Sequence, residues 1–323
     1  MNAIPTSRIT LALFVVAAAV VPLVFASGYQ LFQLTMVLAY AMSVLGKNLT
    51  TGYGGQVSLG QGAFYAVGAY TAAILMDKWD VPYWATLPPA AIAAGTVGLM
   101  LGLPALRLGG LYLALVTFAL ALSVPQLLKY KLFEDWTGGV QGIVILKPDA
   151  PFGLPLTPDQ WLYLFALVVA VVFFVIGTNL VTSRIGRALK AIRDQPLAAE
   201  AMGIELARYK TLTFGTGALF TGIGGALGAI AVGFVSPDSF TLALSLSLFV
   251  GMVVGGAASI SGAIYGALFI QFVPNIAEEI SKAAPGAIYG VILIGFIFFA
   301  PGGFASLVAG WRRRFSAARA RSS

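Results

Sequence analysis

The sequence predicts an all-α protein: a polytopic membrane helix bundle of about ten spans in a single domain over residues 1–323. Of its residues, 59% are hydrophobic and only 10% are charged, and the mean hydropathy is +0.91. A soluble domain carries about 25% charged residues, so lipid must replace water over much of this surface. Apolar runs of about 20 residues, the length that crosses a bilayer core, recur along the whole chain.

Ten apolar runs between polar breaks are the candidate spans. Gly255, Gly256 and Gly262 interrupt two of them, so each of those two is either a crossing or a broken or re-entrant helix. The first run exceeds the 7–15 residues of a secretory signal core, which favours a first span over a cleaved leader. The runs cover residues 9–27, 29–46, 61–77, 84–104, 109–129, 160–182, 210–233, 241–258, 260–277 and 286–303.

The distribution of charge predicts the orientation of the bundle. Cytoplasmic loops of membrane proteins are enriched in Lys and Arg. With the N-terminus inside, the cytoplasmic segments hold 14 of the 19 basic residues and three of the 12 acidic ones. We therefore expect both termini in the cytoplasm, a periplasmic loop at 130–159, a cytoplasmic loop at 183–209 and a basic cytoplasmic tail at 304–323. Membrane topology explains the pI near 9.6 without a nucleic-acid partner.

The two long loops divide the spans into halves of five, and an odd number per half would invert the second half relative to the first. The segment that begins at Ser58 weakly resembles the one that begins at Ser259. Small-residue repeats also arise by chance in membrane proteins. A 5+5 inverted repeat and a chance similarity both stay open.

Several kinds of chemistry are missing from the sequence. It has no Cys, so disulfides and thiolate chemistry are not available, and no His, the commonest metal ligand and proton shuttle. We expect no metal site and no catalytic residue in this chain. It lacks the Gly-rich nucleotide-binding loop, so ATP hydrolysis is not expected in this chain. Every charged residue falls at or near the end of a predicted span, which argues against a proton relay at depth. Sodium coupling stays open, because backbone and hydroxyl oxygens can hold that ion. Active transport would therefore draw its energy from a partner.

The predicted cytoplasmic loop has the composition of two short helices. A basic amphipathic stretch covers residues 184–193, and Asp194 is expected to cap a second helix that has Pro196 in its first turn and ends at Gly203. Such a loop could act as a lever against a partner or lie on anionic lipid headgroups. The candidate coupling residues are Gly186, Arg187, Arg193, Asp194, Pro196, Glu200, Ala201 and Gly203.

A glycine-rich polar segment at 48–64 separates the second and third spans. Glycines make a continuous helix costly there, and irregular backbone near membrane depth needs cover from protein or water. A helix that begins near Ser58 would direct its positive end at an anionic group such as a carboxylate. The alternative is a cytoplasmic turn that packs the adjoining helices. The candidate translocation-path residues are Asn48, Thr50, Gln56, Ser58 and Gln61.

Three segments, at 48–69, 109–115 and 186–204, together resemble the permeases of branched-chain amino acid ABC transporters, and within them the M-type permease. The resemblance covers about residues 30–305. It implies a multi-pass subunit of a bacterial or archaeal inner membrane that translocates Leu, Ile and Val. A sister permease, two ABC ATPase subunits that bind ATP and Mg²⁺, and a periplasmic substrate-binding protein are the implied partners. This chain itself would hold no cofactor.

The same resemblance implies that the cytoplasmic loop is the ATPase-coupling loop of ABC importers. Glu200, Ala201 and Gly203 correspond to its motif, although the glycine follows the acidic residue more closely than is usual. Two alternatives stay open. The same machinery could carry urea, amides, other amino acids or aromatic acids, or the chain could be a stand-alone secondary carrier or channel.

Overall fold

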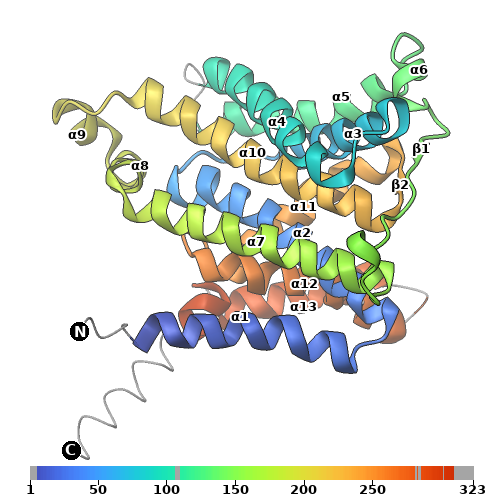
Figure 1. The fold of residues 1–323 in the computed structure, drawn as a ribbon. Helices are drawn as coiled ribbons and strands as arrows, with labels where there is room; N and C mark the ends of the chain where they lie inside the picture. The colour runs from blue at the N-terminus through green and yellow to red at the C-terminus, as the bar shows by residue number, and fades with distance from the viewer. Residues whose placement is uncertain (1–5, 106–109, 281, 283–284, 301, 309–323) are drawn as a thin grey trace, which may run out of the picture.

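The computed structural model is an α-helical bundle, described over residues 6–105, 110–280, 282, 285–300 and 302–308 (Figure 1). Each of the ten predicted spans coincides with a helix, within a few residues at either end. These helices are α1 (Thr6–Phe25), α2 (Gly28–Lys47), α3 (Gln61–Trp79), α4 (Tyr83–Ala105), α5 (Gly110–Leu128), α7 (Pro158–Thr182), α10 (Leu206–Val232), α11 (Leu242–Gly255), α12 (Ile260–Ile280) and α13 (Pro285–Phe299).

Six helical segments of the described chain are long and apolar enough to cross a membrane. They cover residues 28–53, 83–103, 110–128, 158–182, 206–232 and 260–280. Glycines interrupt two of the predicted spans, 241–258 and 260–277. The second of these is a continuous helix of 21 residues, α12. The first is the shorter helix α11, which ends at Gly255.

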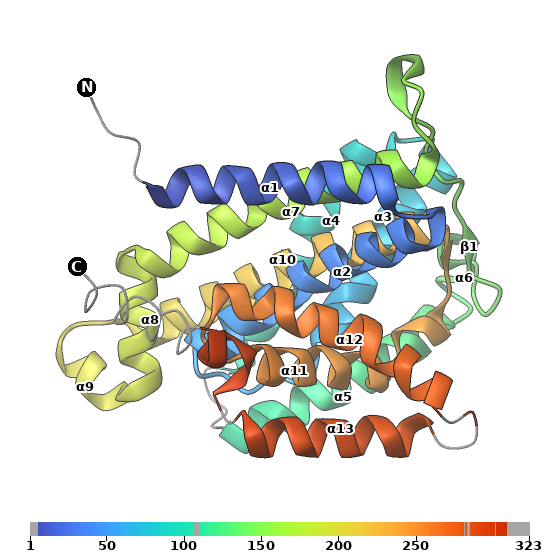
Figure 2. The same ribbon diagram turned by 90° about the horizontal axis from the view of Figure 1, so that it is seen from below.

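The ends of the helices agree with an even number of crossings. In both views, α1 begins and α13 ends at the end of the bundle that carries α8 (Arg184–Asp194) and α9 (Pro196–Ala201) (Figures 1 and 2). The segment with α6 (Glu134–Thr137) and β1 (Ile143–Val144) lies at the opposite end. Which end faces the cytoplasm stays a prediction. The basic residues of the predicted tail, from Arg312 onward, lie outside the described residues.

Helix α10 lies at the centre of the bundle, and α2, α3 and α4 pack around it. Glycines bring the backbones of these helices into contact, the usual packing mode where lipid surrounds the bundle. A methyl group added at Gly68 of α3 would lie 2.5 Å from the Cα atom of Gly222 of α10. One added at Gly225 would lie 2.9 Å from the carbonyl carbon of Tyr65.

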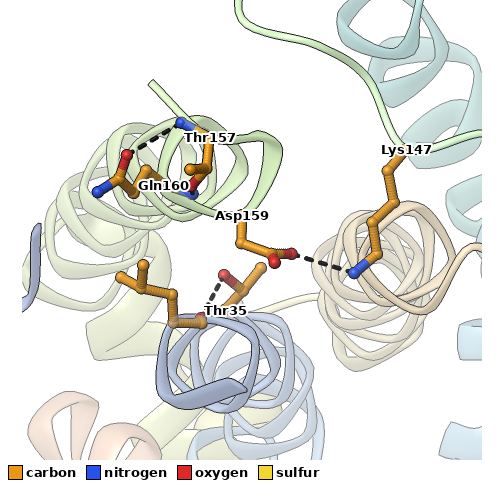
Figure 3. Close-up of polar contacts among 6 residues, drawn as sticks. Thr35, Lys147, Thr157, Asp159 and Gln160 are labelled. Carbon is orange, nitrogen blue, oxygen red and sulfur yellow. Dashed lines mark hydrogen bonds and ion pairs between the residues drawn. The ribbon is translucent and has the colours of Figure 1, made fainter. Parts of the chain in front are cut away.

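The loop at 130–159 is structured, as expected. Besides α6 and the 3₁₀ turn η2 (Pro151–Gly153), its strand β1 pairs with β2 (Phe234–Val235), which precedes a second 3₁₀ turn, η3 (Pro237–Phe240). The Lys147 ammonium lies 3.0 Å from the Asp159 carboxylate at the start of α7 (Figure 3). Thr157 and Gln160 form a reciprocal capping box there.

The weak similarity between the Ser58 and Ser259 segments does not support an inverted repeat. Both segments lie at the same end of the bundle, where the Asn48 side chain donates a hydrogen bond to the Ser259 carbonyl (2.7 Å). Inverted copies would place them at opposite ends. A 5+5 duplication that rests on other segments stays a prediction.

Candidate functional site

A π-helix, η1 (Asn48–Tyr53), continues α2 without a break. Its wider turn is seen in the bond from the Gly54 N–H to the Leu49 carbonyl, five residues back (3.0 Å). Residues 54–60 are irregular, and α3 begins at Gln61. The sequence therefore predicted the break and the new helix, but not the π-helix. Single π-turns within α-helices are frequent at functional sites.

Helix α8 lies across this segment with one buried face, as its amphipathic pattern predicts. Leu189 and Ile192 are buried, whereas Arg187 and Lys190 are exposed. Gly186 allows α8 to turn back on α7, because a methyl group there would lie 2.6 Å from the Cα atom of Val181.

Helix α9 projects from the end of the bundle (Figure 1). It begins at Pro196 as expected, and Gly203, at φ 81°, follows it in the left-handed conformation. The predicted cap is wrong: Gln195 occupies the N-cap position, and Asp194 is the last residue of α8. The Asp194 carboxylate accepts instead from the Arg193 Nε atom (2.8 Å).

The exposed surface of this loop is partly apolar. Leu197 is 82% exposed and Met202 is 83% exposed. A hollow of about 460 Å³ lies beside them, lined by Glu200, Gly203, Ile204, Glu205, Leu206, Ala207 and Lys210. Of the candidate coupling residues, Glu200 and Gly203 line this hollow, and Arg193 and Pro196 line a smaller one of about 130 Å³ on the inner side of the loop.

Arg193 joins the loop to the π-helix. Its Nη1 atom donates to the Gly52 carbonyl (3.0 Å), and its side chain packs on Gly55. The Lys190 ammonium lies 5.7 Å from the ring centroid of Tyr53, within range of a cation–π interaction. The structure thus brings the two predicted groups of residues together.

The five candidate path residues are buried and are bonded within the chain. Gln56 donates to the Lys210 carbonyl (3.1 Å), and Gln61 donates to the Thr221 hydroxyl (2.6 Å). Thr50 donates to the carbonyl of Gly46 (3.1 Å), and the Ser58 hydroxyl accepts from the N–H of Gly60 (3.3 Å). Asn48 bonds the turn between α11 and α12. These contacts favour the packed turn, and contact with a substrate stays a prediction.

Lys47 is the functional candidate that the sequence did not single out. Its side chain is completely buried, its ammonium donates to the Ser58 carbonyl, and it lies 5.0 Å from the ring centroid of Phe249. Lys47 is the last residue of α2, near a span end as predicted, but η1 continues the helical segment to Tyr53 and so encloses the charge within residues 28–53. A second missed residue is Ser245 of α11, whose hydroxyl accepts from the Gly62 N–H (2.9 Å) in the first turn of α3.

The model of one protein family, the branched-chain amino acid transport system permease component, matches residues 29–300. The chain belongs to this family. The permease is 32% identical over 284 residues to the high-affinity branched-chain amino acid transport system permease protein LivM of Escherichia coli K12, and 31% identical to LivM of Salmonella typhimurium LT2. These alignments cover 81% of the permease and 65% of each relative.

The LivH permease protein of Escherichia coli K12 is 26% identical over 281 residues, which are 79% of the permease and 85% of LivH. The identity with LivM is higher, in agreement with the M-type resemblance. No solved structure matches the chain. The family and the apolar helices together identify a multi-pass protein of the cell inner membrane.

Proposed function

We propose that this permease is the membrane subunit of an ATP-driven ABC importer that translocates branched-chain amino acids across the inner membrane. A sister permease would complete the pathway, two ATPase subunits would bind ATP and Mg²⁺, and a periplasmic binding protein would deliver the substrate. The names of the LivM and LivH relatives support the substrate class.

The observation that carries the proposal is the projecting α8–α9 loop. A short helix whose apolar side chains point away from its own protein suits insertion into a groove of a partner, as amphipathic helices do in many complexes. Leu197 and Met202 present such side chains. Lipid headgroups could also receive them, but the contact of Arg193 with the Gly52 carbonyl gives the loop a direct connection into the bundle.

The experiment uses the complete transporter in proteoliposomes, with binding protein and labelled leucine outside and ATP inside. We expect ATP-dependent uptake that vanadate abolishes. Leu197→Asp places a charge on the proposed contact and should lower both ATPase copurification and uptake at least tenfold. Leu146→Asp is the matched control for ATPase copurification, because this leucine is 86% exposed on the loop at the opposite end of the bundle. Its uptake is not compared, since the proposed binding protein would dock at that end.

Three results would count against the proposal. Normal ATPase copurification with Leu197→Asp would exclude α9 as the contact. Uptake of urea or an aromatic acid in place of leucine would assign the same machine another cargo. Transport by this chain alone, driven by an ion gradient and indifferent to vanadate, would identify a secondary carrier.

A further inference from the structure

The Asn48 carboxamide, at the start of η1, is fully occupied by one turn of backbone more than 200 residues away. Its Oδ1 atom accepts from the N–H of Ala258 (2.7 Å). Its Nδ2 atom donates to the carbonyls of Ser259 (2.7 Å) and Gly256 (3.3 Å). The side chain is completely buried, and truncation would leave an N–H and carbonyls unpaired away from water, which destabilises the structure for each group.

The surrounding residues restrict the conformation of Asn48 and of the turn to which it is hydrogen-bonded. A methyl group at Gly52 would overlap the Asn48 carboxamide and would lie 2.6 Å from the Ala258 nitrogen. Ala258 has φ 57°, a left-handed conformation that is unfavourable for a residue with a Cβ atom. Such a conformation persists only where the surrounding structure imposes it, and here the Asn48 bond to the Ala258 N–H helps to impose it.

The bridged turn belongs to a closely packed pair of helices. A methyl group added at Gly255 of α11 would lie 2.8 Å from the carbonyl carbon of Gly262 of α12. One added at Gly266 would lie 2.6 Å from the carbonyl carbon of Gly251. Because the two backbones touch at both of these positions beside the turn, α11 and α12 can move together as one hairpin.

The opposite side of the same π-turn faces the α8–α9 loop. Arg193 of α8 donates to the Gly52 carbonyl (3.0 Å), and Gly52 packs against the Asn48 carboxamide. A continuous series of contacts thus runs from α8 through Gly52 and Asn48 to the α11–α12 turn. The covalent route along the chain between α8 and the α11–α12 turn is much longer than this series of contacts.

We propose that Asn48 is a positioning residue that transmits movement of the α8–α9 loop to the α11–α12 hairpin, through the hydrogen bonds that it makes with residues 256–259. The proposal rests on the proposed function, since a partner must move the loop. It assigns Asn48 to coupling and not to contact with the transported molecule.

The test compares Asn48→Leu with Thr35→Val in the complete transporter. Thr35 lies in α2, the helix that η1 continues, and is equally buried, but its hydroxyl donates to the Leu31 carbonyl within that same helix. We expect Asn48→Leu to assemble and hydrolyse ATP at the wild-type rate while substrate moved per ATP falls at least fivefold. Thr35→Val should keep the wild-type ratio. An unchanged ratio in Asn48→Leu, or an equal loss in both variants, would overturn the proposal.

A second measurement does not depend on the cargo. The chain has no Cys, so spin labels can be placed at Ile264→Cys on α12 and Ile92→Cys on α4, both of which are exposed. Trapped nucleotide should change the distance between these labels in the wild type and in Thr35→Val, but not in Asn48→Leu. No change in the wild type, or an equal change in all three proteins, would refute the role of Asn48 even where leucine uptake is normal.

Asn48→Asp keeps the proposal testable where Asn48→Leu fails to assemble. The aspartate keeps the acceptor for the Ala258 N–H, but it presents an oxygen to the two carbonyls that Nδ2 now meets. We expect partial loss of the coupling ratio and of the distance change. Wild-type values of both in an assembled Asn48→Asp complex would contradict the proposal. If the wild-type transporter takes up no leucine but still shows the distance change, only the proposed substrate is excluded.

Discussion

The contact between α3 and α10 allows a quantitative test of the packing. In Gly68→Ala, the new methyl group would lie 2.5 Å from the Cα atom of Gly222, about 1 Å closer than the favourable separation of ~3.5–4.0 Å between carbon atoms. The opposing atoms are backbone, so no side chain can rotate away and the helices must separate. We therefore expect a cost at the upper part of the range of about 1–3 kcal/mol found for overpacked cores.

The assay is thermal unfolding of the purified permease in one detergent, with Gly290→Ala as the control. A methyl group at Gly290 of α13 meets nothing within 4 Å, so its effect should stay within about 0.5 kcal/mol, as is usual for substitutions without a packing consequence. Gly68→Ala should melt clearly below both the wild type and Gly290→Ala. Equal melting temperatures for the two variants would refute the inference that backbone contact between α3 and α10 limits stability.

Three further predictions concern charge and backbone conformation. Lys47→Met should accumulate as a monodisperse protein in size-exclusion chromatography and Lys47→Glu should not, because a buried carboxylate would face the Ser58 carbonyl that now accepts from Lys47; equal yields would contradict this. A double-mutant cycle on Lys147 and Asp159, which are 37% and 31% exposed, should give a coupling energy of about 0.2–1 kcal/mol that declines with salt; a larger, salt-independent value would be inconsistent with a solvated pair. Gly203→Ala should destabilise the α8–α9 loop by about 1–2 kcal/mol, because φ at Gly203 is 81°, in the left-handed region. Hydrogen exchange of the loop amides measures this free energy. Faster exchange only in other regions would contradict the prediction.

The bundle was largely predictable because its main determinant is local. A helix that faces lipid over much of its length must be apolar along that length, so each span appears in the sequence as a separate run. The same holds for α8, whose alternation of basic and apolar residues matches its buried Leu189 and Ile192, and for the helix end at Gly203. Neither prediction needed knowledge of distant parts of the chain.

The details of the site depend on tertiary contacts that no local pattern encodes. Lys47 follows the predicted span 29–46 and adjoins a polar segment, and the wider turn of η1 extends the helix past it and encloses the ammonium against Phe249. Asn48 was singled out for its polarity, whereas its partners lie in the α11–α12 turn. Asp194 is one position too early for the cap, because it is still part of helix α8, and Gln195 (φ −149°, ψ 85°) is the non-helical residue before Pro196.

The length of α11 has a consequence for the backbone around it. Its 14 residues rise about 21 Å at 1.5 Å per residue, whereas the hydrocarbon layer is about 30 Å thick. A crossing at α11 would leave about a third of that thickness to chain outside this helix. In that layer water is absent, so the peptide groups beyond each end of α11 depend on partners from elsewhere in the protein, and Asn48 supplies three such bonds beyond its C-terminal end.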